Sequence, residues 1–319
     1  MQEARRLFPL APEPFIDLST GINPLPYPIP QLETEAWTRL PEPEAVTALE
    51  AVAAKAYGNS DAAMVAAAPG TQILISLLPR LFPQDSVAIL GPTYGEYARA
   101  FAAAGSKVIE ARHIGELRAA LCIVICNPNN PDGRRHDTAT LLDLVDARPK
   151  GGLVIVDEAF ADLEDAALSL TSSLPQRGLV VLRSFSKAYG LGGLRLAFAL
   201  AGQDIAAPLR AALGPWPVSG PAIDIGRRTL GDRPWLAAAK RRLASDVARL
   251  DGILRDAGLA LVGGTHLFRL AATPQARETA RRLGEAGILV RSFDYRPDWL
   301  RFGIPGSEDA WQRLASALA

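Results

Sequence analysis

In the middle of the chain, segments with the hydrophobic pattern of strands alternate with segments that have the pattern of helices. Short apolar runs rich in Val, Ile and Leu recur there, as at residues 121–126, 153–156 and 179–182. Uninterrupted runs of this kind are typical of strands that are buried on both faces of a sheet. Segments of helical periodicity separate them, such as residues 46–56 and 141–147. The alternation predicts an α/β domain with a mostly parallel sheet sandwiched by helices.

The two ends of the chain follow different patterns. Seven prolines lie between Pro9 and Pro30, so this segment cannot form a long helix or a central strand. We expect an extended arm over residues 1–45 that contributes to the substrate site and completes a smaller domain. The pattern changes again at Pro215-Trp216-Pro217, after which a long helical stretch with a break near Pro234 precedes short strands and helices. This predicts a large domain over residues 46–214 and a small α+β domain over residues 215–319.

Composition and charge narrow the classes of partner. Lys and Arg total 34, as do Asp and Glu, so the formal net charge is zero. This balance gives no reason to expect nucleic acid or an anionic membrane as a partner. No stretch is apolar for eighteen residues, and the N-terminus lacks the apolar core of a signal peptide, so we expect a cytoplasmic protein. Cys122 and Cys126 fall within one predicted strand and are expected to be buried thiols, with no metal site.

Polar side chains and glycines follow five of the predicted strands. In open α/β sheets, ligands bind beyond the carboxyl ends of the strands. The five strand ends should therefore meet along one edge and form a single ligand site. The segments that follow the strands are Pro69-Gly70-Thr71-Gln72, Gly91-Pro92-Thr93-Tyr94, residues 127–133 (NPNNPDG), Asp157-Glu158-Ala159-Phe160 and residues 183–187 (RSFSK).

Each segment offers a group with a definite chemical use. Gly70 and Thr71 at a helix start offer backbone N–H groups and a hydroxyl to an anion such as phosphate. Asp157 ends an apolar strand, where a lone carboxylate is costly to bury unless a cation such as a protonated ring nitrogen meets it. Lys187 lies among hydroxyls and before Arg195, and a lowered pKa would make its amine nucleophilic.

Two further residues complete this set. Tyr94 offers a flat face for stacking, and Asn130 offers a side-chain donor to a phenolate oxygen. Taken singly, these segments also fit ordinary helix caps, turns and surface lysines. A phosphorylated, protonated pyridine aldehyde satisfies all of them at once, in the order in which they occur.

Two other readings use the same region. The segment Ser184-Phe185-Ser186-Lys187 is an S-x-x-K, the nucleophile motif of penicillin-binding proteins and class A β-lactamases. That family also needs S-D-N and K-T-G, and neither occurs in the chain. A cofactor-binding regulator is the second reading. Regulators of this type carry an added DNA-binding domain, for which the predicted organisation leaves no room.

Three motifs resemble those of the aminotransferase class I/II superfamily of fold-type I pyridoxal-5′-phosphate enzymes. They are SFSKAYGLGGLR, NPNNPDG and DEAF, in the family's order. The resemblance implies pyridoxal 5′-phosphate as the cofactor, held as a Schiff base on Lys187. It further implies that Asp157 meets the pyridine nitrogen, that Asn130 bonds the phenolic oxygen, and that Tyr94 stacks on the ring.

The resemblance also assigns the groups around the cofactor and substrate. It implies that Gly70, Thr71, Ser184 and Arg195 form the phosphate cup. It implies a homodimer in which Tyr57, within AKAYGNS, reaches the neighbouring subunit's site. It also implies that Arg301, within WLRFGIPG, binds the substrate carboxylate. Phe160 is a departure, because many relatives carry Tyr there. Without the tyrosine hydroxyl, Asn130 should be the main partner of the phenolic oxygen.

Within the superfamily, two groups of enzymes are most similar. The opening FIDLSTGINPLPYP and the ending VRSF…LRFGIPG resemble threonine-phosphate decarboxylases of cobalamin biosynthesis. This implies decarboxylation of a small phosphorylated amino acid, L-threonine O-3-phosphate, whose distal phosphate we expect to meet Asn23 and Arg291. The alternative is transamination by a histidinol-phosphate or related aminotransferase. The two reactions differ in which Cα bond is held perpendicular to the cofactor ring, and the sequence does not show that geometry.

Overall fold

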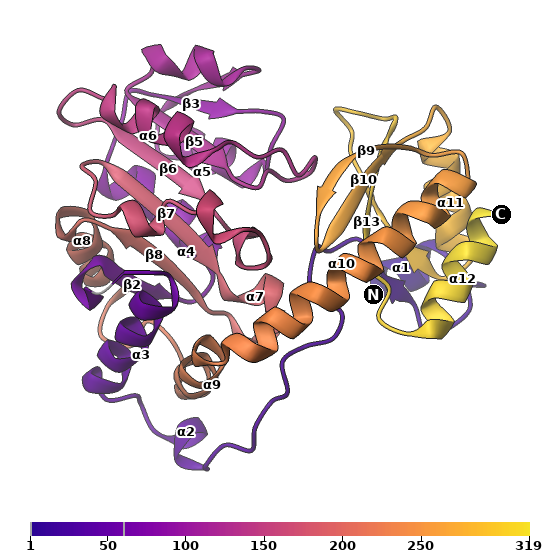
Figure 1. Cartoon of the computed structure of the whole chain (residues 1–319), viewed down its shortest axis with the longest axis horizontal. Coiled ribbons are helices and arrows are strands. Elements are labelled where there is room, and N and C mark those ends of the chain that lie inside the picture. Colours follow the sequence, from indigo (N-terminus) through magenta and orange to yellow (C-terminus); the bar gives the residue numbers. More distant parts are fainter. Residues whose placement is uncertain (1, 60) are drawn as a thin grey trace.

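The computed structural model describes residues 2–59 and 61–319, and it forms two lobes joined by one long helix (Figure 1). The larger lobe contains a seven-stranded sheet in the order β2-β8-β7-β6-β5-β3-β4. All neighbouring strands are parallel except at β8, which runs antiparallel to both β2 and β7. The predicted mostly parallel sheet is therefore confirmed. Its strands are β2 (Val65–Ala68), β3 (Ser86–Leu90), β4 (Lys107–Ala111), β5 (Cys122–Cys126), β6 (Leu153–Asp157), β7 (Leu179–Ser184) and β8 (Ala197–Ala201).

Helices cover both faces of this sheet. Successive residues of a strand point to opposite faces, and accordingly Ile123 and Val124 of β5 belong to separate core clusters. One cluster packs under α4, α5 and α8, and the other under α3, α6 and α9. This double burial explains why β5, β6 and β7 are continuous apolar runs. The helices are α3 (Pro43–Ala56), α4 (Thr71–Leu81), α5 (Glu96–Ala103), α6 (Thr138–Asp146), α7 (Phe185–Ala188), α8 (Gln203–Leu213) and α9 (Gly220–Gly231).

The smaller lobe is built on a four-stranded antiparallel sheet in the order β12-β13-β10-β9. The arm adds a short strand to this lobe, because β1 (Ile16–Asp17) pairs in parallel with β11 (Ile288–Leu289). The remaining arm helices are α1 (Gln2–Leu7) and α2 (Glu35–Thr38). The lobe otherwise consists of α10 (Arg233–Asp256), β9 (Ala260–Thr265), β10 (Phe268–Ala272), α11 (Ala276–Glu285), β12 (Arg291–Ser292), β13 (Trp299–Gly303) and α12 (Glu308–Leu318).

The lobes divide at a different place from the boundary predicted at residue 215. Helix α9 packs against α3 of the larger lobe, where Gly226 lies against Leu49 and Leu196. The prolines at 215 and 217 therefore separate two helices of one lobe and do not separate two domains. The chain passes from one lobe to the other along α10. The Asp232 carboxylate caps the start of this helix, where it accepts from the backbone N–H of Trp235 at 3.0 Å.

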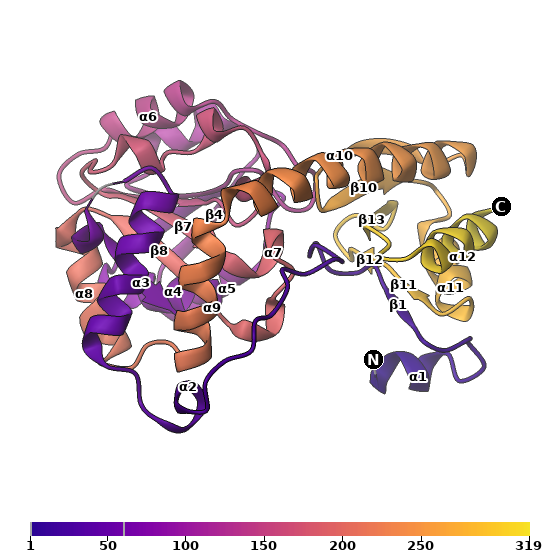
Figure 2. The ribbon, with the colours of Figure 1, turned by 60° about the horizontal axis from the view of Figure 1, so that its bottom comes forward.

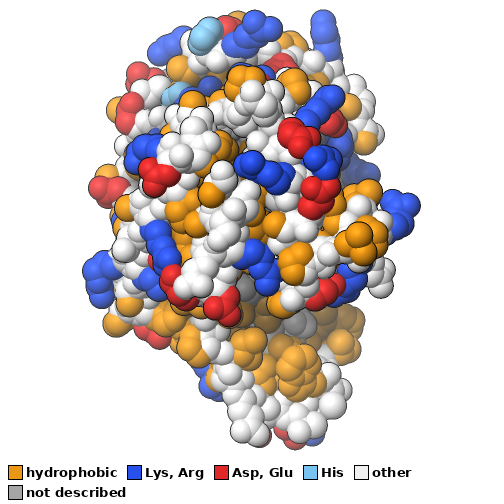
Figure 3. All heavy atoms as spheres, turned by 90° about the vertical axis from the view of Figure 1, so that its right-hand side faces the viewer, with side chains coloured by type: hydrophobic (Ala, Val, Ile, Leu, Met, Phe, Trp, Pro, Cys, Tyr) orange, Lys and Arg blue, Asp and Glu red, His pale blue; other side chains and the backbone are white. Residues whose placement is uncertain are grey.

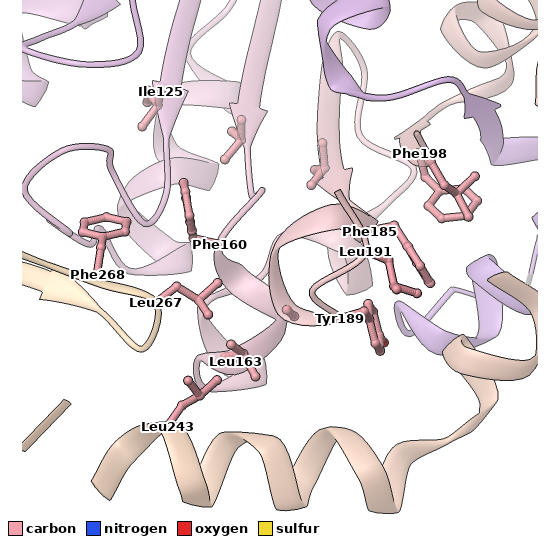
Figure 4. Close-up of a cluster of buried hydrophobic side chains, with 14 of the residues drawn as sticks. Ile125, Phe160, Leu163, Phe185, Tyr189, Leu191, Phe198, Leu243, Leu267 and Phe268 are labelled. Carbon is pink, nitrogen blue, oxygen red and sulfur yellow. The ribbon is translucent and has the colours of Figure 1, made fainter. Parts of the chain in front are cut away.

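A hydrophobic cluster continues from the larger lobe into the junction with the smaller one. Figure 4 shows Phe160 and Phe268 facing each other there, and their ring centroids are 5.1 Å apart at an interplanar angle of 84°. Nearby, Gly133 has a φ of 72°, and a Cβ at this position would collide with the carbonyl of Gly264. The β9–β10 hairpin can therefore lie directly on the loop that carries Asn130.

The arm passes between the lobes. Figure 2 shows it leaving β1, running beside α7 and reaching α2 and α3 on the larger lobe. Along this path the backbone N–H of Tyr27 donates to the carbonyl of Tyr189 at 2.8 Å. Figure 3 shows charges of both signs interspersed over the face that the smaller lobe presents. Within residues 2–59 and 61–319, no helix is long and apolar enough to cross a membrane.

Candidate active site

A cavity of about 670 Å³ lies where the two lobes and the arm meet. One side of it comes from residues at the carboxyl ends of β5, β6 and β7. The other side comes from the arm, at residues 19–21, and from the segment 291–295 with Arg301. The volume falls in the range of pockets that enclose a small ligand. The position agrees with the rule that ligands bind beyond the carboxyl ends of strands in an α/β sheet.

Most of the residues selected from the sequence meet at this cavity. Gly70, Ser184 and Arg195 lie next to it at the starts of α4 and α7 and in the turn before β8. Asn23 and Tyr57 do not line it. The selected residues that do are Thr71, Tyr94, Asn130, Asp157, Lys187, Arg291 and Arg301.

Lys187 lies on the short helix α7, which directly follows β7. Burial lowers the pKa of its amine, and the positive charges of Arg301 and Arg195 lower it further, while Asp157 opposes them. The Nζ atom lies 5.6 Å from the ring centroid of Phe160, which forms one wall of the cavity. A lowered pKa increases the fraction of neutral amine at neutral pH. The lysine is thus prepared to act as a nucleophile toward a carbonyl carbon.

Asp157 ends β6 with its side chain at the floor of the cavity. Its Oδ1 accepts from the backbone N–H of Ala159 at 2.9 Å, and its Oδ2 accepts from the hydroxyl of Tyr97 at 2.8 Å. Burial raises the pKa of this carboxyl, while the two hydrogen bonds and Lys187 oppose the rise. A carboxylate held in this way can meet a cationic ring nitrogen.

Gly70, Thr71 and Arg195 form a cradle at the start of α4. Gly70 has a φ of 91° and a Cβ there would collide with the guanidinium of Arg195. Arg195 itself has a φ of 54°, which is uncommon for a residue other than glycine. Its Nη1 donates to the carbonyl of Gly192 at 3.1 Å, which holds the side chain near Gly70. Free backbone N–H groups at the helix start and an adjacent guanidinium can together hold a phosphate.

Arg301 connects the smaller lobe to both the arm and the larger lobe. Its Nη2 donates to the backbone carbonyl of Ser19 at 2.7 Å, and its Nη1 donates to Oδ1 of Asn130. With the oxygen of Asn130 so engaged, the Nδ2 group of the same amide is left to donate to another acceptor. Burial lowers the pKa of Arg301 to about 10, with a further contribution from Arg291, so the side chain is still a cation at neutral pH.

Arg291 and Arg301 form a pair of like charges on neighbouring strands. They are directly opposite each other in the antiparallel pairing of β12 and β13, and both line the cavity. Like charges directly opposite each other destabilise a sheet. Neither arginine has a carboxylate partner within the described residues, and Nε of Arg301 is buried without any partner there. The pair is suited to a ligand that brings negative charge.

Two of the selected residues, Asn23 and Tyr57, lie away from the cavity. The Asn23 side chain is buried away from the cavity: its Nδ2 donates to the carbonyl of Ala188 at 2.8 Å, and its Oδ1 accepts from Nη2 of Arg242 at 2.6 Å. It is thus not free to bind a substrate phosphate. The Tyr57 hydroxyl lies inside its own chain, because the Arg183 guanidinium covers its ring at 4.5 Å. Tyr57 lines a second cavity, of about 430 Å³.

The cavity also contains residues that the sequence did not indicate. Ser19 and Thr20 come from the arm, Glu96 and Arg99 from α5, and Tyr295 from the loop before β13. None of them directly follows a strand of the large sheet, which was the signal used. Within the described residues, no group of three His, Cys, Asp or Glu side chains is arranged to hold a metal ion.

The sequence matches the aminotransferase class I and II family over residues 13–318, so the chain belongs to this family. Within it, the chain is 45% identical to a threonine-phosphate decarboxylase of Sinorhizobium over 97% of its own length and 92% of that protein. It is 39% identical to a threonine-phosphate decarboxylase of Pseudomonas aeruginosa, over 100% of this chain and 95% of the other.

The fold is shared with enzymes of other names in the same family. The histidinol-phosphate aminotransferase of Sinorhizobium meliloti, solved with pyridoxal-5′-phosphate, superposes with a TM-score of 0.88 over 99% of this chain and 93% of that one, at 22% identity. The fold is therefore that of a fold-type I pyridoxal-phosphate enzyme, and its cofactor is pyridoxal 5′-phosphate. The cradle at Gly70, the carboxylate of Asp157 and the amine of Lys187 fit the phosphate, ring nitrogen and aldehyde of that molecule.

Proposed function

We propose that the chain decarboxylates L-threonine O-3-phosphate to (R)-1-amino-2-propanol O-2-phosphate, a step of cobalamin biosynthesis. The observation that carries this proposal is the pair Arg291 and Arg301, two cations without carboxylate partners among the described residues at one end of the cavity. The proposed substrate carries both a carboxylate and a phosphate, and these two anionic groups match the two cations. The names of the two relatives that match nearly the whole chain support the same choice.

We assign the cofactor to the strand-end side of the cavity. When bound, pyridoxal phosphate supplies an electron sink for the charge that remains on Cα after CO₂ leaves. Lys187 holds its aldehyde carbon, and Asp157 keeps a proton on its ring nitrogen. Asn130 would donate from Nδ2 to the phenolic oxygen, and Tyr94 would offer its ring for stacking on the cofactor. The cradle of Gly70, Thr71, Ser184 and Arg195 receives the cofactor phosphate.

We assign the substrate to the arm and the smaller lobe. Arg301 would hold the substrate carboxylate and so orient the Cα–carboxylate bond, and this orientation decides whether that bond is the one broken. Arg291 on the opposite strand receives the distal phosphate. Ser19 and Thr20 of the arm close the remaining side and exclude water. Replacement by the substrate amine would free the amine of Lys187, which would take up the proton released in that exchange and deliver it to Cα after CO₂ has left.

We further propose that the chain works in the cytoplasm as a homodimer. Apolar side chains are exposed along the arm and after α8, with Ile29 66%, Trp37 69%, Leu40 64% and Trp216 53% exposed. Side chains of this size are commonly covered in an assembly. Sedimentation equilibrium measures the assembly state, and Trp37→Glu should weaken it. Two buried free thiols, Cys122 and Cys126, suit a reducing compartment.

The test of the reaction is incubation of the cofactor-loaded protein with L-threonine O-3-phosphate. We expect release of CO₂ and formation of the phosphorylated amino alcohol in the absence of any 2-oxo acid. A parallel incubation contains histidinol phosphate and 2-oxoglutarate. Formation of glutamate there, with no CO₂ from the first mixture, would replace decarboxylation by transamination as the activity of the chain.

A further inference from the structure

We propose that Tyr97 is a positioning residue that acts through Asp157 and keeps the shared proton on the cofactor's ring nitrogen. Tyr97 lies on α5, three residues after Tyr94, and none of its surface is exposed. Asp157 lines the cavity, and Tyr97 does not. The tyrosine therefore acts on the carboxylate from behind, without touching substrate or cofactor. This inference rests on the role proposed for Asp157, but it does not depend on which Cα bond is broken.

The carboxylate has a donor on each oxygen. Tyr97 donates to Oδ2 at 2.8 Å, and the backbone N–H of Ala159 donates to Oδ1 at 2.9 Å. The second bond is made by the backbone and is available to any residue at position 159 other than proline. The first bond depends on a single side chain. Together the two bonds determine the plane of the carboxylate and so the direction from which it meets the ring.

The tyrosine can act only as a donor to Asp157. Burial raises the pKa of its hydroxyl well above the usual value, and the negative charge of Asp157 raises it further. The thiol of Cys126, opposite Asp157 in the pairing of β5 and β6, is also neutral, because burial raises its pKa. Lys187 is the nearby cation, and its own charge is diminished by burial. The Tyr97 hydroxyl is thus a permanent neutral donor in a site where charges vary.

This arrangement decides where one proton is located. The proton shared by Asp157 and the ring nitrogen can be on the nitrogen, with an ionised carboxylate, or on the carboxyl, with a neutral ring. Burial favours the second state because it raises the pKa of the carboxyl. The hydrogen bond from Tyr97 stabilises the ionised carboxylate and so favours the first state. A protonated ring is the form that accepts charge from Cα.

The experiment measures the ¹⁵N chemical shift of ring-labelled pyridoxal phosphate bound to the protein at neutral pH. In Tyr97→Phe we expect the proton distribution to move about tenfold toward the carboxyl oxygen, and kcat to fall with KM little changed. Site-specific 3-fluorotyrosine at position 97 keeps the hydroxyl and makes it a stronger donor. It should move the signal in the opposite direction, and it tests the inference if the phenylalanine variant does not fold.

Two control variants separate the possible failures. Tyr189→Phe removes another buried hydroxyl, near Lys187 and without a bond to Asp157, and should leave the ¹⁵N signal unchanged. Asp157→Asn should move the signal strongly toward an unprotonated ring. If it does not, the proposed role of Asp157 is wrong. If Asp157→Asn moves the signal and both changes at Tyr97 leave it at the wild-type position, the inference about Tyr97 alone is overturned.

Discussion

The two sides of the cavity are constructed differently. The cofactor side comes from neighbouring strands of one sheet, and Asp157 and Ser184 there are 7% and 3% exposed. The substrate side comes from the arm and from a separate sheet, where Tyr295 is 52% exposed and Arg291 is also at the surface. Hydrogen bonds of a single sheet hold the first set in place. The second set meets only because the arm and the smaller lobe fold against the larger one.

This difference has a consequence for the effects of substitutions. A change on the cofactor side should alter the binding and protonation of the cofactor, and with them every reaction the site performs. A change on the substrate side should alter the choice and affinity of substrate while the cofactor is still bound normally. The absorption spectrum of the bound cofactor reports the first kind of effect, and the ratio kcat/KM for different substrates reports the second.

The largest effect is expected on the cofactor side, from Lys187→Ala. Without the amine, the cofactor loses its covalent attachment and Cα loses its proton donor. We expect activity to fall by roughly a thousandfold or more. Borohydride reduction followed by mass spectrometry of the intact protein tests the attachment. The exposed Lys55 on α3 offers a control, because Lys55→Ala should still give the cofactor adduct. An adduct that persists in Lys187→Ala would contradict the assignment.

A smaller but still large effect is expected from Arg301→Gln. Glutamine keeps one polar amide group but is shorter than arginine, so it weakens the contacts of Arg301 with the Ser19 carbonyl and the Asn130 oxygen and provides no charge for a carboxylate. Loss of a buried charge-assisted contact should lower kcat/KM for L-threonine O-3-phosphate by roughly a hundredfold. The cofactor spectrum should change little. Unchanged kcat/KM would show that the substrate carboxylate binds elsewhere.

Arg291→Gln should have a weaker and more selective effect. Arg291 is exposed, so solvent screens its interaction with a phosphate. We expect KM for the phosphorylated substrate to rise about tenfold with kcat nearly unchanged, since 1.4 kcal/mol corresponds to tenfold in affinity. Arg281→Gln, on the exposed face of α11, is the matched control. If both variants raise KM equally, the effect comes from overall charge and Arg291 has no specific role.

The same difference in construction explains what the sequence predicts and what it does not. Asp157 ends a buried strand, and Asn130 and Lys187 lie within four residues after buried strands, so their meeting point follows from the sheet alone. Tyr97 lies three residues after Tyr94, but no periodic pattern shows that its hydroxyl turns back toward the end of β6. The lobe boundary was also misplaced, because the prolines between α8 and α9 give no information about which core α9 joins.

The arm shows why the direction of a side chain escapes prediction. Residues 19–21 of the arm line the cavity. Asn23, however, turns away from the cavity and toward α7, because the end of that short helix leaves carbonyl groups without intrahelical partners. Its backbone N–H donates to the carbonyl of Lys187 at 2.9 Å, and its amide donates to that of Ala188. Which of two neighbouring polar surfaces a side chain faces depends on tertiary contacts.

Asn23 belongs to the arm, on the substrate side, but it holds the turn that carries Lys187, on the cofactor side. The two sides of the cavity are therefore not fully independent. Asn23→Ala removes the bond to Ala188 and the acceptor that Nη2 of Arg242 meets at 2.6 Å. We expect a loss of about 1 kcal/mol in the free energy of unfolding and a several-fold decrease in kcat, the smallest effect of the series. A shifted cofactor spectrum would show that the arm acts on the cofactor side. Asn23→Asp keeps the acceptor for Arg242 and loses the donor to Ala188, so it should retain the defect. Wild-type kcat in Asn23→Asp would mean that the arm is held through Arg242 and that Lys187 does not depend on it.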